Sequence, residues 1–371
     1  MHFALLLAGL GTALLGPILP VLAAQWRLDD AQSGVLMLAK FCGAFLGGVS
    51  VSGNLQRSLL VGLISGSVGF GCFAIAPDMA IGCGALFVGG FGIGLVITAT
   101  NILAGRRFTV HRGSALSLLN FSFSLGAMLS ALLAAWLLPR FALRSLLEWF
   151  AGLFVMGVAV MLLELRGASA EDAAFEASSA ANSEKRMGAR MYLYFAGLLF
   201  LYGGLETCLS GWLTTFALRY GSKTLVVSEY TTLLLWMALT VGRAGASAVM
   251  LRVGEKTVQR WGLVLTAVFT AGLAVSHSAV LIAAYAVLLG LSLAPFFPST
   301  WALLMVEQPA ARQAGIVLAV SGLGAAALPW LMGVVSTGAG SLQLALALPL
   351  ATALALLAMS VFSPAARPAV D

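Results

Sequence analysis

Three charged side chains lie inside long apolar stretches of this 371-residue sequence: Glu206, Lys40 and Arg243. Glu206 falls near the middle of the segment from Met191 to Leu218, and Lys40 near the middle of another apolar segment. A charge at the centre of a bilayer costs about 2.5–3.5 kcal/mol on insertion scales, so such residues normally face protein or water and have a partner. The chemistry that they indicate is reversible proton binding and recognition of a polar or charged solute.

Each of these charges admits more than one role. Glu206 either carries a proton or binds substrate, since burial favours the neutral form of a carboxyl, or it only pins helices together. Lys40 is a countercharge to Glu206, an anchor for an anionic substrate, or a packing lysine. Arg243 is expected mainly to reach the cytoplasmic headgroups or to act at a gate, rather than to bind the substrate directly.

Polar and aromatic residues recur at helical spacing on four of the apolar segments, which gives each segment one polar face. Such faces suit a wet cavity in which amides bind sugar hydroxyls and flat rings cover the apolar face of a pyranose. The alternative is that the hydroxyls and amides mediate helix packing and the tryptophans fill the core. The candidate residues are Thr98, Asn101, Asn120, Tyr202, Ser210, Trp212, Phe297 and Trp301.

The composition excludes an ordinary soluble domain. Hydrophobic residues make up 60% of the chain and charged residues only 9%, whereas about a quarter of the residues of soluble domains are charged. A spanning helix needs roughly 20 apolar residues. The sequence therefore predicts an all-α polytopic membrane protein with twelve transmembrane helices, near residues 3–24, 31–51, 58–77, 80–104, 114–138, 147–165, 190–217, 229–250, 260–276, 280–305, 314–335 and 342–363.

The basic residues orient these helices. Thirteen of them lie in connectors on the side of the two termini, and five lie on the opposite side: Arg27, Arg140, Arg144, Arg219 and Lys223. Lys and Arg accumulate on the cytoplasmic side, so both termini are expected in the cytoplasm of a cell whose inner or plasma membrane holds the protein. The net charge of +6 thus reflects topology and does not indicate a nucleic-acid partner.

The sequence contains no motif that indicates a cofactor site or an enzyme active site. The four cysteines form no CxxC pair, and the sequence has no HExxH pair, no nucleotide-binding loop and no convincing Ser/His/Asp set. The glycines of GFGIG, from Gly90 to Gly94, lie within a predicted span with no strand before them, so they do not indicate a dinucleotide site. We expect no metal, no cofactor and no enzyme activity.

The chain divides into two similar halves. A charged, Ala/Ser-rich linker over 166–189 separates an N-terminal six-helix bundle, 1–165, from a C-terminal six-helix bundle, 190–371. Small residues recur 200 positions apart in helices 4 and 10, most clearly Gly90 and Gly290. Duplicated halves around a midplane site are how many secondary transporters are built.

Five segments carry a resemblance to a known family: GPILPVLAAQWRLDDAQSG, GFGIGLVITATN, YGGLETCLSGWLTTF, LLLWMALTVGR and GLSLAPFFPSTWALL. The chain resembles the major facilitator superfamily, and its last three segments resemble the branch of fucose permease and the glucose/galactose transporters. The resemblance implies two pseudo-symmetric six-helix bundles that transport by alternating access. The sequence departs from the family in two places. The helix 2–3 signature is reduced to GGVSVSGNLQRS, and helices 1 and 4 lack the carboxylates of fucose permease-like proteins, so those coupling residues are not carried over.

The leading hypothesis is a monomeric secondary transporter that moves a small polar solute, a sugar or sugar-like compound, together with protons across the lipid bilayer. Glu206 would be the proton or substrate carboxyl, and Lys40 its partner or an anion anchor. A first alternative keeps the fold but carries organic anions, bound by Lys40, or exports amphipathic compounds as multidrug carriers do. A second alternative is a membrane receptor that binds a ligand without moving it.

Overall fold

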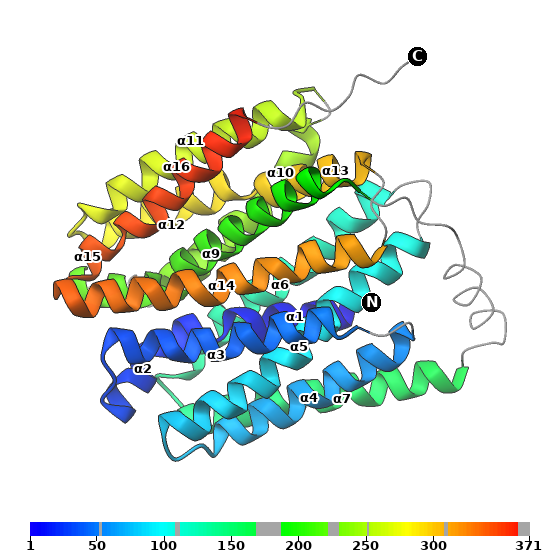
Figure 1. Ribbon diagram of the computed structural model, residues 1–371. Helices are drawn as coiled ribbons and strands as arrows, with labels where there is room; N and C mark the ends of the chain where they lie inside the picture. The colour runs from blue at the N-terminus through cyan, green and yellow to red at the C-terminus, as the bar shows by residue number, and fades with distance from the viewer. Residues whose placement is uncertain are drawn as a thin grey trace.

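The computed structural model describes residues 1–51, 54–107, 112–167, 187–221, 230–250, 252–307 and 311–362. Within these ranges the regular elements are helices, and most of them run side by side along one direction (Figure 1). The first described helix begins, and the last one ends, toward the same end of this bundle, on the right in Figure 1. Residues 168–186, most of the predicted linker, fall outside the described part of the chain.

The helices form twelve rods within the described residues. The first, tenth and twelfth rods each consist of two consecutive helices. The N-terminal half contains α1 (His2–Ala13), α2 (Leu15–Trp26), α3 (Asp30–Val49), α4 (Leu55–Ala74), α5 (Met79–Arg107), α6 (Arg112–Leu137) and α7 (Leu143–Gly167). The C-terminal half contains α9 (Ala189–Tyr220), α10 (Thr231–Met250), α11 (Glu255–Ala274), α12 (Ala279–Leu293), α13 (Phe296–Val306), α14 (Ala311–Ala339), α15 (Leu342–Ala345) and α16 (Ala347–Val361). Ten of the rods are long and apolar enough, as described, to cross a membrane.

The breaks in the rods follow from the sequence. The polar SHS segment separates α11 from α12, so the predicted division of that long apolar run is confirmed. The first rod is interrupted at Leu14 and the tenth at Ala294 and Pro295. Pro17 and Pro298 lack the N–H that would bond to the carbonyl four residues earlier, so each weakens the helix at that point.

The two halves repeat each other's packing. In the first half α3 contacts α5, α1 contacts α6, and α4 contacts α7. In the second half α10 contacts α12, α9 contacts α14, and α11 contacts α16. Each of these pairs occupies the positions in its half that the corresponding pair occupies in the first half. Gly90 faces Lys40 so closely that an added Cβ would lie 1.8 Å from the Lys40 carbonyl oxygen, and Gly290 faces the Leu235 carbonyl oxygen in the same way at 2.3 Å. The predicted pair of pseudo-symmetric six-helix bundles is confirmed.

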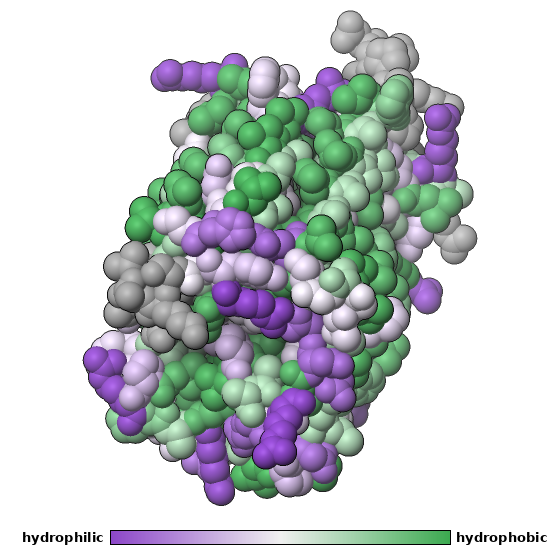
Figure 2. All heavy atoms as spheres, turned by 90° about the vertical axis from the view of Figure 1, so that its left-hand side faces the viewer, coloured by the Kyte–Doolittle hydropathy of each residue, from purple (hydrophilic) through white to green (hydrophobic). Residues whose placement is uncertain are grey.

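Polar contacts join the halves at the end opposite the chain termini. Arg219 donates to the two carboxylate oxygens of Asp30 at 2.7 and 2.8 Å, and the Ser336 hydroxyl donates to the same carboxylate at 2.5 Å. The N–H of Ala31 donates to the Thr337 hydroxyl at 2.9 Å. Figure 2 looks onto this end and shows hydrophilic side chains gathered across its middle. We call Asp30, Arg219 and Ser336 the end clamp.

Backbone packing closes the same end. A Cβ on Gly34 would lie 2.9 Å from the Cα of Trp330, and a Cβ on Gly333 would lie 2.3 Å from the Asp30 carbonyl oxygen. Both contacts join α3 of the N-terminal half to α14 of the C-terminal half. The halves therefore meet there without intervening side chains.

Replacing Asp30 with Asn is expected to shift the protein toward a state open at this end by about threefold to tenfold, because a bidentate, partly buried ion pair contributes about 1 kcal/mol. The measurement is the distance distribution between spin labels at Gln25 and Leu344, which are exposed on opposite halves at this end. The control Glu148→Gln breaks an exposed pair with Arg144 inside one half and should leave the distribution unchanged. An unchanged distribution in the Asp30 variant would show that the end clamp does not hold the halves together.

Candidate functional site

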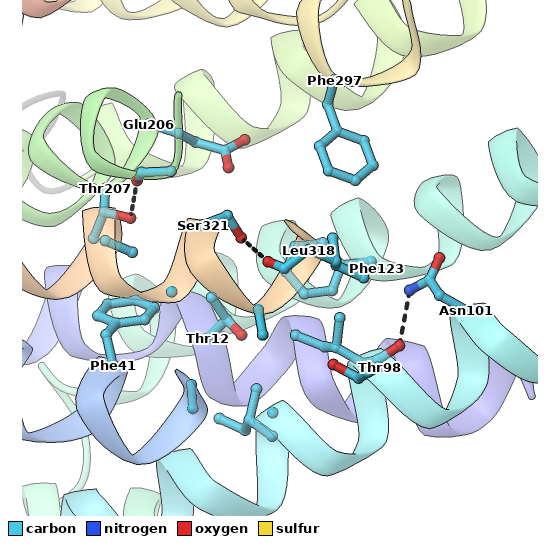
Figure 3. A pocket seen from close by; sticks show the side chains of 18 of the residues that line it. Thr12, Phe41, Thr98, Asn101, Phe123, Glu206, Thr207, Phe297, Leu318 and Ser321 are labelled. Carbon is cyan, nitrogen blue, oxygen red and sulfur yellow. Dashed lines mark hydrogen bonds between the residues drawn. The ribbon is translucent and has the colours of Figure 1, made fainter. Parts of the chain in front are cut away.

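A cavity lies between the two halves, near the middle of the bundle. It encloses about 930 Å³, part of it continuous with the solvent, and both halves contribute to its walls. Seven predicted site residues line it: Thr98, Asn101, Asn120, Tyr202, Glu206, Arg243 and Phe297. Figure 3 shows the side chains of Glu206, Phe297, Phe41 and Thr98 arranged around this space, with Asn101 bonded to the backbone beside it.

A partly buried ion pair lies in the cavity wall. Arg243 Nη2 is 3.3 Å from Glu206 Oε1, and the Tyr202 hydroxyl donates to the same oxygen at 3.1 Å. Arg243 also donates to the Ser124 hydroxyl of α6, so its guanidinium bridges the two halves. Arg243 is only 5% exposed. The expectation that it reaches the headgroups is therefore wrong, because Glu206 offers a compensating charge inside the protein.

Lys40 bonds to a backbone carbonyl oxygen and does not form an ion pair with Glu206. Its ammonium donates to the Thr12 carbonyl oxygen at 2.5 Å and lies 5.0 Å from the centre of the Phe41 ring, and the residue is 2% exposed. Thr12 belongs to the last turn of α1, where carbonyls lack helical partners and the helix dipole attracts a cation. The observed partner of Glu206 is thus Arg243, and Lys40 instead holds the interrupted end of α1.

A second, smaller pocket adjoins the cavity; we call it the side pocket. It encloses about 420 Å³, including space continuous with its surroundings. Lys40 and Ser210 line it, together with Glu206, which faces both spaces. Two further residues predicted for the site thus lie beside the cavity rather than in it.

Two predicted residues line neither space. Trp212 is buried, and its indole N–H donates to the Pro329 carbonyl oxygen at 3.0 Å, so it binds α9 to α14. Trp301 stacks on Phe297 with ring centres 6.1 Å apart and planes at 9°. Phe297 presents its ring to the cavity, and Trp301 lies one helical turn further along α13. Helical spacing aligned Trp301 with Phe297, and Trp212 was expected near the face of Glu206, but in the structure both tryptophans pack beside the cavity wall.

Several lining residues carried no clear signal in the sequence: Thr12, Phe41, Phe123, Thr207 and Ser321. Thr207 and Ser321 donate their hydroxyls to backbone carbonyls of their own helices, at 2.7 and 2.6 Å, which is also common for packing residues. Thr12 could have been suspected, because it lies just before the break that Pro17 produces. Within the described ranges, no three His, Cys, Asp or Glu side chains gather as a possible metal-ligand set.

A comparison with known protein families shows to which family this chain belongs. A family model described as Major Facilitator Superfamily matches residues 1–329. The chain belongs to the Major Facilitator Superfamily. It is therefore a multi-pass membrane transporter rather than an enzyme, and the resemblance that the sequence motifs indicated is confirmed.

Two curated proteins that resemble this chain match different lengths of it. The 4-hydroxybenzoate transporter PcaK of Pseudomonas aeruginosa is 32% identical over 168 residues, which cover 42% of this chain and 36% of that protein. The chain thus matches only about a third of the length of this relative. Bypass of stop codon protein 6 of Saccharomyces cerevisiae is 23% identical over 377 residues, covering 90% of this chain and 75% of that protein.

Solved structures share the fold over nearly the whole chain. The xylose transporter XylE from E. coli, in a partially occluded inward open conformation, superposes with a TM-score of 0.77 at 12% identity and covers 98% of this chain and 96% of its own. The transporter FucP in the outward conformation gives a TM-score of 0.63 at 15% identity and covers 99% of both chains. At these identities the likeness shows the fold alone.

Proposed function

We propose that this transporter couples the movement of a small, polar, ring-bearing solute to protons, by alternating access, with Glu206 as the group that carries the proton. The observation that supports the proposal is the partly buried Glu206–Arg243 ion pair in the wall of the central cavity. Intramembrane ionisable residues mark proton and substrate pathways in membrane carriers. A pair that faces the solute space is well placed to bind both.

Proton and solute would be linked through Arg243. While Glu206 is ionised, its charge neutralises the guanidinium at 3.3 Å. When Glu206 takes up a proton, Arg243 keeps its charge and turns to an acceptor group of the solute. Proton and solute then favour each other's binding, and linkage makes that preference reciprocal.

The cavity walls suit a ring that carries polar substituents. Asn101 and Asn120 offer amides, Thr98 a hydroxyl, and Phe297 and Tyr202 aromatic faces. A neutral sugar is one candidate solute, in line with the xylose and fucose carriers of the same fold. A ring-bearing organic acid is the other, in line with the 4-hydroxybenzoate transporters. The second is favoured by charge, because the charged residues that line the two spaces, among those described, are two cations and one acid: Lys40, Arg243 and Glu206.

The closed end indicates which way the cavity faces. The end clamp joins the halves on the side opposite the termini. With the termini in the cytoplasm, as the basic connectors predict, the cavity of this carrier would face inward. We propose that the carrier is a monomer. We propose the plasma membrane as its location.

Uptake into proteoliposomes tests the proposal. Radiolabelled L-fucose, D-xylose, benzoate and 4-hydroxybenzoate are offered one at a time, with and without an imposed acidic exterior. We expect at least one to accumulate only with the gradient and to leak out when a protonophore collapses it. Equal uptake with and without the gradient would contradict proton coupling. Saturable binding without any flux would instead favour a receptor.

A further inference from the structure

We propose that the side pocket is a carboxylate subsite formed by Lys40 of α3 and Trp236 of α10, so that the solute of this carrier is an organic monoanion whose ring occupies the central cavity. The inference rests on the proposed function only in taking the central cavity as the solute site. It adds the substrate class and two residues that bind it.

The side pocket opens onto the cavity. Five residues line both spaces: Thr12, Phe41, Phe123, Glu206 and Thr207. A solute in the cavity therefore reaches the side pocket with one end while its body remains between the aromatic side chains. A flat ring with one substituent matches this arrangement better than a solute with polar groups on all sides.

Lys40 supplies a buried positive charge to this pocket. One of its three N–H donors bonds to the Thr12 carbonyl oxygen, and its ammonium lies beside the Phe41 ring. None of the ion pairs found among the described residues involves Lys40. A carbonyl and an aromatic face stabilise a cation only partly, and a buried charge without a countercharge is costly. An anion bound beside Lys40 would supply that countercharge.

Trp236 supplies a neutral donor from the other half. It is 2% exposed and lines the side pocket, and its indole N–H has no hydrogen-bond acceptor among the described residues. Its ring is held edge-on against Phe123, with centres 6.5 Å apart. Buried donors are nearly always satisfied, so an orphan N–H at a pocket wall indicates a missing acceptor. The two oxygens of a carboxylate accept from Lys40 and Trp236 together, and so connect the two halves.

Glu206 makes this subsite dependent on a proton. Its carboxyl lines the same pocket and, while ionised, repels a second carboxylate. The titratable and charged groups that face Glu206 are Arg243 from α10, Tyr202 one turn earlier on α9, and Lys40 across the side pocket from α3. The walls from α1 and α14 contribute the hydroxyls of Thr12 and Ser321. One proton on Glu206 therefore accompanies one bound anion.

The test compares benzoate with its neutral isostere benzamide, using the purified full chain and thermal-shift titrations at acidic and neutral pH. Benzoate is expected to raise the Tm at lower concentration than benzamide, and more strongly at acidic pH. Lys40→Met should weaken benzoate binding by about tenfold or more and leave benzamide binding nearly unchanged, since it removes a charged donor. Trp236→Phe should weaken benzoate severalfold. The control Lys256→Met changes an exposed lysine of α11 and should have no effect.

Any of three results would overturn the subsite. The first is benzamide binding as tight as that of benzoate, the second is equal benzoate affinity of the Lys40→Met variant and the unchanged protein, and the third is the absence of benzoate binding. If Lys40→Met fails to fold, Trp236→Phe and the benzoate–benzamide comparison still decide. Failure of the proposed function has a different signature. If benzoate binding depends on Lys40 but no proton-driven flux is seen, the proton coupling is contradicted and the subsite stands. If D-xylose or L-fucose shows proton-driven flux and benzoate does not bind, the subsite is contradicted and the proton coupling stands.

Discussion

Glu206→Gln is expected to abolish proton-driven accumulation while solute exchange across the membrane continues. Glutamine has the shape of a protonated glutamate and keeps Arg243 without a carboxylate partner, so the solute still binds, but no proton is taken up or released. One pH unit is worth about 1.4 kcal/mol, so a gradient of two units drives about a hundredfold accumulation at one proton per solute. In the variant the accumulation ratio should fall to about one.

The measurement is the internal concentration of the solute that the wild-type protein accumulates, together with counterflow exchange in the absence of a gradient. Glu148→Gln is the matched control, because Glu148 is exposed, pairs with Arg144, and lines neither the cavity nor the side pocket. Accumulation at the wild-type level in Glu206→Gln would exclude Glu206 as the proton carrier. Loss of both accumulation and exchange would mean that Glu206 is needed for binding itself.

Gly324→Ala is expected to destabilise the protein more than other single-methyl changes in α14. An alanine Cβ at this position would lie 1.7 Å from the Phe200 carbonyl oxygen of α9, which is backbone and cannot turn away. Helices in membranes associate through such close approaches of small residues. Forcing α14 away from α9 should cost about 3 kcal/mol, at the upper end of overpacking effects.

The Tm of the purified protein and its yield as a single species in size-exclusion chromatography measure this effect. Gly338→Ala is the matched control in the same helix, because an added Cβ there meets nothing within 4 Å. That substitution should leave the Tm unchanged or raise it slightly, since alanine favours a helix over glycine. Equal Tm values for the two variants would show that α14 and α9 separate without cost.

The rods and their duplication could be predicted from the sequence because each depends on local properties. The lengths of the apolar segments predict the twelve rods, and the SHS segment accounts for the division before Ala279. The match between Gly90 and Gly290 also had a physical basis, since each glycine lets a backbone carbonyl of the neighbouring helix approach. Helix lengths, helix ends and small-residue positions can be predicted because each depends on the residues of a single segment.

The partners of the buried charges could not be predicted in this way. The sequence offered only Lys40 as a countercharge to Glu206, whereas the structure pairs Glu206 with Arg243. Which cation reaches Glu206 depends on how three helices are rotated about their axes. Those rotations are set by backbone contacts such as that of Gly90 with the Lys40 carbonyl, which no single segment reveals. The burial of Trp212 against Pro329 has the same origin, because it follows from the contact of α9 with α14.

The backbone contacts of Gly34 and Gly333 at the closed end also bear on how the cell conserves energy. A continuous file of water through this end would let protons bypass Glu206, the proposed proton carrier, and dissipate a proton gradient without moving any solute. Backbone packed against backbone takes up the space that such a file needs at these two points. We therefore expect the glycines that let the halves close to limit proton leak across the membrane as well.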